Sequence, residues 1–158
     1  MRILIDADSC TQLKNAEEIA EHFKIQCIGV FNFANDIRLT YAEPVLVPIR
    51  PGSADDKIYG MVASGDIVVT ADRELTQRCI EKGAVVFHTV GMVYPERVMN
   101  TLMGVSYDNF FKEPANAFTS NLKNLHHGHS PSQHQKRVFS ARLIVFLRNL
   151  QNSANVEK

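Results

Sequence analysis

Residues 3–8 read "ILIDAD", an apolar run that ends abruptly in two carboxylates. Three large apolar residues in succession, without polar alternation, are typical of a strand buried on both faces of a parallel sheet. Asp6 then stands where this strand, expected over residues 2–6, leaves the core. An acid at that point serves no local turn or helix cap, so the stretch predicts a buried strand with a functional carboxylate at its end.

Short apolar runs alternate with helical periods along the first hundred residues. Further strands are expected over residues 25–31, 44–49, 66–70 and 84–88, and helices over residues 11–23, 52–63, 71–83 and 95–103. This order predicts the α/β class, with three α/β/α layers around a mostly parallel central sheet. The whole of residues 1–150 is expected to form one domain.

Turn and cap residues set the expected ends of these elements. Ser53 is suited to be the N-cap of the helix over 52–63. Gly83 is suited to end the helix over 71–83. Pro95 suits a first helical position. The two prolines in residues 44–49 place that strand at an edge of the sheet or shorten it.

The C-terminal third differs in composition from the rest. Residues 112–150 carry six Lys or Arg against one Glu, whereas residues 1–111 carry 15 acids against 10 Lys or Arg. Residues 112–133 lack a sustained period and indicate a long loop, residues 135–150 an amphipathic closing helix, and residues 151–158 a disordered tail. Either the basic segment meets a polyanion or it only neutralises the acidic body.

Composition and length limit the class of protein. A chain of 158 residues with 45% hydrophobic and 22% charged residues is globular and long enough for a real core. No apolar run is long enough to span a membrane, and the early carboxylates argue against a secretory signal. Three cysteines without metal-ligand spacing indicate reduced thiols and a cytoplasmic protein. The sequence leaves a monomer and a homo-oligomer both open.

Several carboxylates are expected at one rim of the sheet, because parallel strands end at the same edge. They follow strands or open helices entered from that edge, and they are Asp6, Asp8, Asp55, Asp56 and Asp72. Two such charges about 4 Å apart repel by roughly 4 kcal/mol at an effective dielectric near 20, so the cluster takes up protons or binds a cation. Oxygen donors alone suit Mg²⁺ or Mn²⁺, which catalyse phosphoryl chemistry in such places.

Several of these acids, and the other candidate site residues, also have simpler interpretations. Asp8 and Asp72 could cap the helices that follow them, and the acids of 55–56 could only favour a first helical turn. Cys10 could be a nucleophile, although no histidine is placed to activate it. The histidines at 126, 127, 129 and 134 could bind a transition metal or do nothing.

Four phrases of the chain together resemble one protein family. They are "RILIDADSC" (2–10), "SADDKI" (53–58), "GDIVVTADREL" (65–75) and "EKGAVVFHTVGMVY" (81–94). In this order and spacing, over roughly residues 1–105, the chain resembles the bacterial YaiI/YqxD family, which is uncharacterised and grouped with the PIN-like nuclease fold. The resemblance implies a PIN-like domain with a Mg²⁺- or Mn²⁺-dependent site that hydrolyses phosphodiesters of RNA, or less often of DNA.

The resemblance also assigns roles to residues. Asp6, Asp55 and Asp72 are similar to the catalytic acids, and Asp8 and Asp56 stand beside them as metal ligands. Asn35 falls where members often have a polar residue, and it is expected to contact nucleic acid together with Lys136, Arg137 and Arg142 of the basic helix.

The chain departs from the family pattern at three places. Residues 9–11 read Ser-Cys-Thr where members usually have Ala-Cys-Pro, and Gly52 stands where many members have Asp. Gln135 and Lys136 replace the Asp and Arg of a motif before the last helix. These departures remove one candidate ligand and put the role of the tail motif in doubt.

Three functions therefore remain open. The first is a metal-dependent nuclease with RNA as its expected partner. The second is a PIN-like module that binds RNA or a protein without cutting it. The third is a phosphatase of the haloacid dehalogenase type with Asp6 as its nucleophile, which is weaker because Cys10 stands where that family needs Thr or Val.

Overall fold

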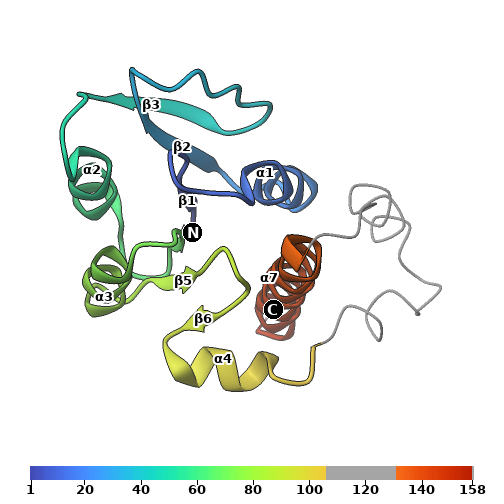
Figure 1. Cartoon of the computed structure of the whole chain (residues 1–158). Helices are drawn as coiled ribbons and strands as arrows, with labels where there is room; N and C mark the ends of the chain where they lie inside the picture. The colour runs from blue at the N-terminus through green and yellow to red at the C-terminus, as the bar shows by residue number, and fades with distance from the viewer. Residues whose placement is uncertain (106–130, 158) are drawn as a thin grey trace.

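The computed structural model describes residues 1–105 and 131–157 and confirms the α/β class. In chain order the elements are β1 (Ile3–Asp6), α1 (Leu13–His22), β2 (Cys27–Asn32), β3 (Glu43–Val47), α2 (Ser53–Met61), β4 (Ile67–Val69), α3 (Arg73–Glu81), β5 (Val85–Phe87), β6 (Val93–Tyr94), α4 (Glu96–Leu102) and α7 (Pro131–Val156). Helices α2 and α3 cover one face of the sheet, and α1 and α7 cover the other (Figure 1). The three expected layers are present.

The sheet has six strands in the order β3-β2-β1-β4-β5-β6, and all neighbouring pairs except β5–β6 are parallel. The chain adds β2 and β3 on one side of β1 and then crosses to β4 on the other side. The strand order therefore reverses at β1, and in open parallel sheets ligands bind in the crevice beyond the strand ends at such a point. Asp6 is the last residue of β1 and stands at that crevice.

Strand β1 is central because its side chains are apolar on both sides. Ile3 and Ile5 pack in the core below α1 and α7, and Leu4 packs in the core below α2 and α3. All three are fully buried, as the unbroken apolar run predicts. Strand β3 is at the edge of the sheet, where its proline was expected to place it.

Three element ends differ from the expectation. Ser53 is not an N-cap: Gly52 precedes α2 with a left-handed φ of 77°, and the Ser53 hydroxyl donates to Pro48 O at 2.6 Å. Pro95 is the N-cap of α4 rather than its first residue. Strand β6 was not expected, because a two-residue antiparallel edge strand leaves almost no periodic signal.

Helix α7 is longer at both ends than the sequence indicated. It begins at Pro131, inside the expected loop, and continues to Val156. The prediction of a disordered tail over 151–158 is therefore wrong for residues 151–156. Its middle is fixed by burial of Phe139, Leu143 and Ile144 against the sheet, and a nucleated helix adds further residues at little cost. The remaining expected loop, with the histidines at 126, 127 and 129, lies outside the described residues.

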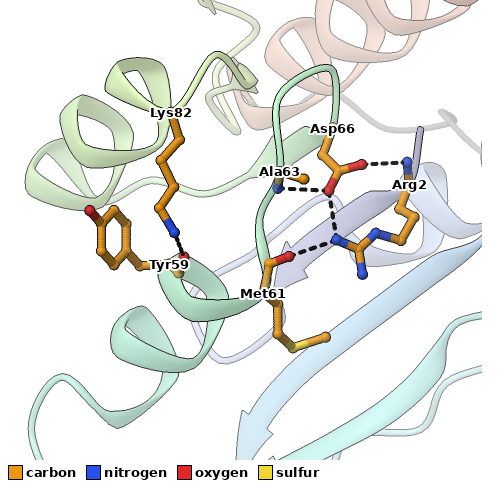
Figure 2. A network of polar contacts seen from close by, with 6 residues as sticks. All are labelled: Arg2, Tyr59, Met61, Ala63, Asp66 and Lys82. Atoms are coloured by element: carbon orange, nitrogen blue, oxygen red, sulfur yellow. Dashed lines mark hydrogen bonds and ion pairs between the residues drawn. The ribbon is translucent and has the colours of Figure 1, made fainter.

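An ion pair stands at the opposite end of the strands from Asp6. Asp66 precedes β4 and accepts hydrogen bonds from Arg2 N at 2.9 Å, Arg2 Nη2 at 2.8 Å and Ala63 N at 3.0 Å (Figure 2). Burial alone would raise the pKa of Asp66, but the bonds from Arg2 and Ala63 outweigh it and lower that pKa. The carboxylate at this end is therefore neutralised by a cation.

Within residues 1–105 and 131–157, no helix combines the length and the apolar character needed to cross a membrane.

Candidate acidic site at the sheet rim

Asp6 is buried at the rim, with 5% of its surface exposed. Its Oδ2 accepts hydrogen bonds from Ser9 Oγ at 2.8 Å and from Thr70 Oγ1 at 3.1 Å. Burial raises the pKa of Asp6, the two hydroxyls oppose that shift, and the charges of Asp8 and Asp72 add to it. Unlike Asp66, this buried carboxylate has no cation beside it among the described residues.

Asp6 also begins a turn, contrary to the expectation that it serves none. Ser9 N donates to Asp6 O at 3.4 Å while the Ser9 side chain bonds the carboxylate. The turn follows directly on the end of β1, and its Ser9 hydroxyl holds one carboxylate oxygen of Asp6 in place.

Asp72 is joined to Asp6 through a single hydroxyl. Thr70 Oγ1 donates to Asp6 and accepts from Asp72 N at 3.1 Å, so one threonine holds both strand ends. Asp72 is the N-cap of α3, because its Oδ1 accepts from Leu75 N at 2.7 Å. The simpler interpretation as a helix cap is thus confirmed for Oδ1, while no group in residues 1–105 or 131–157 bonds Oδ2.

Asp55 belongs to the same cluster, and Asp56 does not face it. Burial raises the pKa of Asp55 to about 6, with further contributions from the charges of Asp72 and Asp6. The neighbouring Asp56 is exposed and lies 3.4 Å from Arg78 Nη1 on α3. The first turn of α2 therefore presents one acid to the rim and the other to a surface ion pair.

Asp8 connects the rim to the segment after β2. Its Oδ2 accepts from Asn32 N at 3.0 Å and its Oδ1 accepts from Asn35 Nδ2 at 2.6 Å. It does not cap α1, because the N-cap of that helix is Gln12. Both oxygens of Asp8 are engaged in positioning this segment, and its charge acts on Asp6 from there.

The basic candidates lie on α7. Arg142 Nη1 donates to Gly91 O at 2.6 Å, and the side chain lines a cavity of about 590 Å³ that shares no residue with the acidic rim. Lys136 and Arg137 are half-buried, and Val138 beside them packs so closely on Gly91 that an added Cβ there would lie 2.7 Å from Val138 Cγ1. The basic start of α7 therefore adjoins the turn between β5 and β6.

Cys10 is not suited to be a nucleophile. Burial raises the pKa of its thiol to about 12, and the charge of Asp6 adds to that shift. A thiol with that pKa is protonated near neutral pH and is a weak nucleophile.

A cation between the carboxylates has to be judged from the donors present. Within the described ranges, no three His, Cys, Asp or Glu side chains are grouped closely enough to hold a metal ion between them. The rim donors are carboxylate oxygens, and Mg²⁺ commonly takes only one or two protein carboxylates together with waters and substrate phosphates. The carboxylate oxygens of Asp6 and Asp72 are donors of the type that an open magnesium or manganese site uses.

Two residues that organise the site were missed by the sequence reasoning. Ser9 and Thr70 bond the same oxygen of Asp6. Thr70 directly follows the buried strand β4, and Ser9 comes three residues after a strand-end acid, which is the spacing of a side-chain turn. Hydroxyls at those positions are signals that could have been used.

Stability should depend on pH through Asp55. A carboxyl with a folded pKa of about 6 binds more protons in the native than in the unfolded chain, so native stability falls as pH rises from about 4 to about 6. Asp55→Asn should therefore raise the melting temperature at pH 7.5 in EDTA by about 3 °C, after allowance for solvent screening, and leave it unchanged at pH 4. Asp56→Asn is the matched control on the same helix. Equal melting temperatures for wild type and Asp55→Asn at pH 7.5 would contradict the prediction.

Comparison with known proteins shows which family the chain matches. Residues 4–147 match the family described as uncharacterised, YaiI/YqxD family. A UPF0178 protein of Listeria monocytogenes is 29% identical over 149 residues, which are 94% of this chain and 98% of the relative. A UPF0178 protein of Rhodospirillum rubrum is 37% identical over 101 residues, which are 61% of this chain and 65% of the relative.

A solved structure also resembles the chain. It is a mutant of Rae1 (YacP) from Bacillus subtilis, with a TM-score of 0.45 and 14% sequence identity, covering 95% of this chain and 99% of that one. A likeness of this degree carries no conclusion about what the chain does.

Proposed function

The chain belongs to the YaiI/YqxD family of uncharacterised bacterial proteins, and from its acidic rim we propose that it is a divalent-metal-dependent nuclease acting on RNA. The observation that carries the proposal is the electrostatic proximity of three carboxylates that come from three parts of the chain. The charges of Asp72 and Asp6 contribute to the raised pKa of Asp55, and the charge of Asp72 contributes to the raised pKa of Asp6, at the point where the strand order reverses.

The buried acids at the two ends of the sheet differ in their surroundings, and the difference supports a bound cation as the partner of Asp6. Asp66 is buried with Arg2 and its pKa is lowered, whereas Asp6 is buried among other acids and its pKa is raised. Natural folds keep such destabilising groups mainly where function requires them. The oxygen donors of Asp6 and Asp72 would hold Mg²⁺ or Mn²⁺. The negative charge of Asp8, which already acts on Asp6, would add to the attraction for the cation.

Each residue of the rim would have a separate role in phosphodiester hydrolysis. When bound, a divalent ion supplies neutralisation of charge on the phosphate oxygens. Ser9 and Thr70 fix one oxygen of Asp6, so its carboxylate keeps one orientation. Asp55, with a pKa of about 6, is suited to accept a proton from the attacking water near neutral pH.

The expected substrate follows from charge. Lys136 and Arg137 at the start of α7 adjoin the turn beside the rim and would contact the phosphate backbone on either side of the cut. Asn35, held against Asp8, would contact the substrate at the other side of β1. A single strand reaches such a crevice more easily than a duplex does.

The test is incubation of the purified chain with end-labelled single-stranded RNA or DNA in EDTA, Mg²⁺ or Mn²⁺. We expect cleavage of RNA only with metal, and a rise in melting temperature with Mn²⁺ over the same concentration range. Binding of RNA without cleavage at any metal concentration would instead indicate the non-catalytic module. A phosphorylated Asp6 trapped from a phosphate ester would indicate the phosphatase.

A further inference from the structure

The strand register places a histidine in the same row as Asp6. Ile5 of β1 pairs with Val69 of β4, and Val69 pairs with Phe87 of β5. The residues that follow these three on their strands are Asp6, Thr70 and His88. Pairing continues past the strand ends, since Thr70 N donates to Phe87 O at 3.2 Å and His88 N donates to Met92 O at 2.8 Å.

Alternation along the strands decides which way this row faces. The residues two positions earlier are Leu4, Val68 and Val86, which all lie in the core below α2 and α3. Because side chains two residues apart in a strand share a face, Asp6, Thr70 and His88 point to the side of α2 and α3. The bond between Thr70 Oγ1 and Asp6 Oδ2 agrees with that placement. Asp55 and Asp72 open the two helices on this same side.

The imidazole of His88 is held in one orientation. Val90 N donates to His88 Nδ1 at 3.1 Å, so in the neutral ring the proton is on Nε2. The His88 backbone is fixed as well, because its N and O atoms both bond within the turn to Met92 and Gly91. No described residue accepts a hydrogen bond from Nε2. His88 therefore offers a positioned N–H donor at the rim, where the hydroxyls of Ser9 and Thr70 already donate to Asp6.

The distance across the row suits a phosphate group. His88 is two strands from Asp6, which is about 10 Å between backbones at the usual strand spacing. That span leaves room for a phosphate between the histidine and an ion on Asp6. Carboxylates repel a phosphate, so a hydrogen-bond donor on the far side of the row is the group that an anionic oxygen needs.

We propose that His88 Nε2 donates a hydrogen bond to a non-bridging phosphate oxygen of the nucleic-acid substrate. The proposal rests on the nuclease function and adds a substrate-binding residue that is distant in sequence from the acids. The competing role is structural, since His88 also accepts the bond from Val90 N and so holds the turn.

Two amide variants separate these roles. In His88→Asn the side-chain oxygen can replace Nδ1 as acceptor for Val90 N, but nothing replaces Nε2. In His88→Gln the amide nitrogen reaches the place of Nε2 and can still donate. A structural role predicts that Asn is the better substitute, and phosphate binding predicts that Gln is. His134→Asn, at an exposed histidine on α7, is the control.

The experiment measures kcat/KM on single-stranded RNA with Mn²⁺, together with the melting temperature of each variant. We expect His88→Asn to lose kcat/KM by about ten- to hundredfold with an unchanged melting temperature, and His88→Gln to lose clearly less. The imidazole ¹⁵N signals of His88 should also shift when a non-cleavable 2′-O-methyl oligonucleotide is added with Mg²⁺.

The outcomes distinguish this proposal from the function on which it rests. Full activity of His88→Asn in a chain that cleaves RNA would overturn the role of His88 and leave the nuclease function standing. A shift of the His88 signals without any cleavage would support the contact while the nuclease function fails. A chain that neither cleaves nor binds the oligonucleotide would overturn both.

Discussion

Under the proposed nuclease function, replacing Asp6 with asparagine is expected to lower the rate of RNA cleavage by about a hundredfold or more, because the change would remove both a charge and a ligand for the metal ion. The asparagine side chain keeps an oxygen that can accept from Ser9 and Thr70, so the local structure should survive. It also removes a buried charge whose pKa is raised by burial and by neighbouring acids. The melting temperature in EDTA should therefore stay the same or rise.

The combination of lost activity and retained stability is what identifies a functional acid. Cleavage should be measured at saturating Mn²⁺, and the melting temperature with and without Mn²⁺, because the variant should also lose the stabilisation by metal. Asp36→Asn is the control, since Asp36 is an exposed acid in the segment after β2. Cleavage by Asp6→Asn at the wild-type rate would exclude Asp6 from the reaction.

Replacing Glu17 with alanine is expected to destabilise the fold by about 4 kcal/mol, because buried backbone donors lose a charged acceptor. Glu17 lies on α1 and has no exposed surface. Its Oε1 accepts from the backbone N–H groups of Thr40 at 2.9 Å, Tyr41 at 3.0 Å and Ala42 at 2.9 Å. Oε2 also accepts from Thr40 Oγ1 at 3.2 Å. One carboxylate thus joins α1 to the chain that leads into β3.

Urea denaturation checks this prediction. Glu21→Ala, at an exposed position on the same helix, is the matched control and should change the free energy of unfolding by less than about 0.5 kcal/mol. Glu17→Gln should fall between the two, since its amide retains one acceptor oxygen. If the Glu17→Ala and Glu21→Ala midpoints coincide, the four hydrogen bonds contribute nothing to stability.

Glu17 and Asp6 show that two buried acids can have opposite purposes. Glu17 is surrounded by N–H donors that stabilise its charge. Asp6 receives two hydroxyl bonds but also the repulsion of neighbouring acids. A buried acid is thus a functional candidate only when its surroundings leave the charge incompletely stabilised. The sequence predicts a functional role for Asp6 but does not single out Glu17, because no local pattern shows that a glutamate in a helix is buried.

Local sequence patterns are enough to predict the layers and the position of the acids along the chain. Unbroken apolar runs such as residues 3–5 specify strands buried on both faces, and chain direction then puts the acids that follow parallel strands at one rim. Asp6 and Asp72 could be placed there without a structure. The family resemblance over "ILIDAD", "SADDKI" and "VVTAD" was carried by the same residues and is confirmed by the match over residues 4–147.

Which side chains meet depends on contacts that local sequence patterns do not specify. Strand register is a long-range property, so the row of Asp6, Thr70 and His88 could not be derived from local patterns. The same holds for Asp56, which faces Arg78 although it is adjacent to Asp55, and for the full length of α7, which depends on packing against the sheet. Local propensity and chain direction place residues at an edge, whereas contacts between distant segments determine which of them form a site.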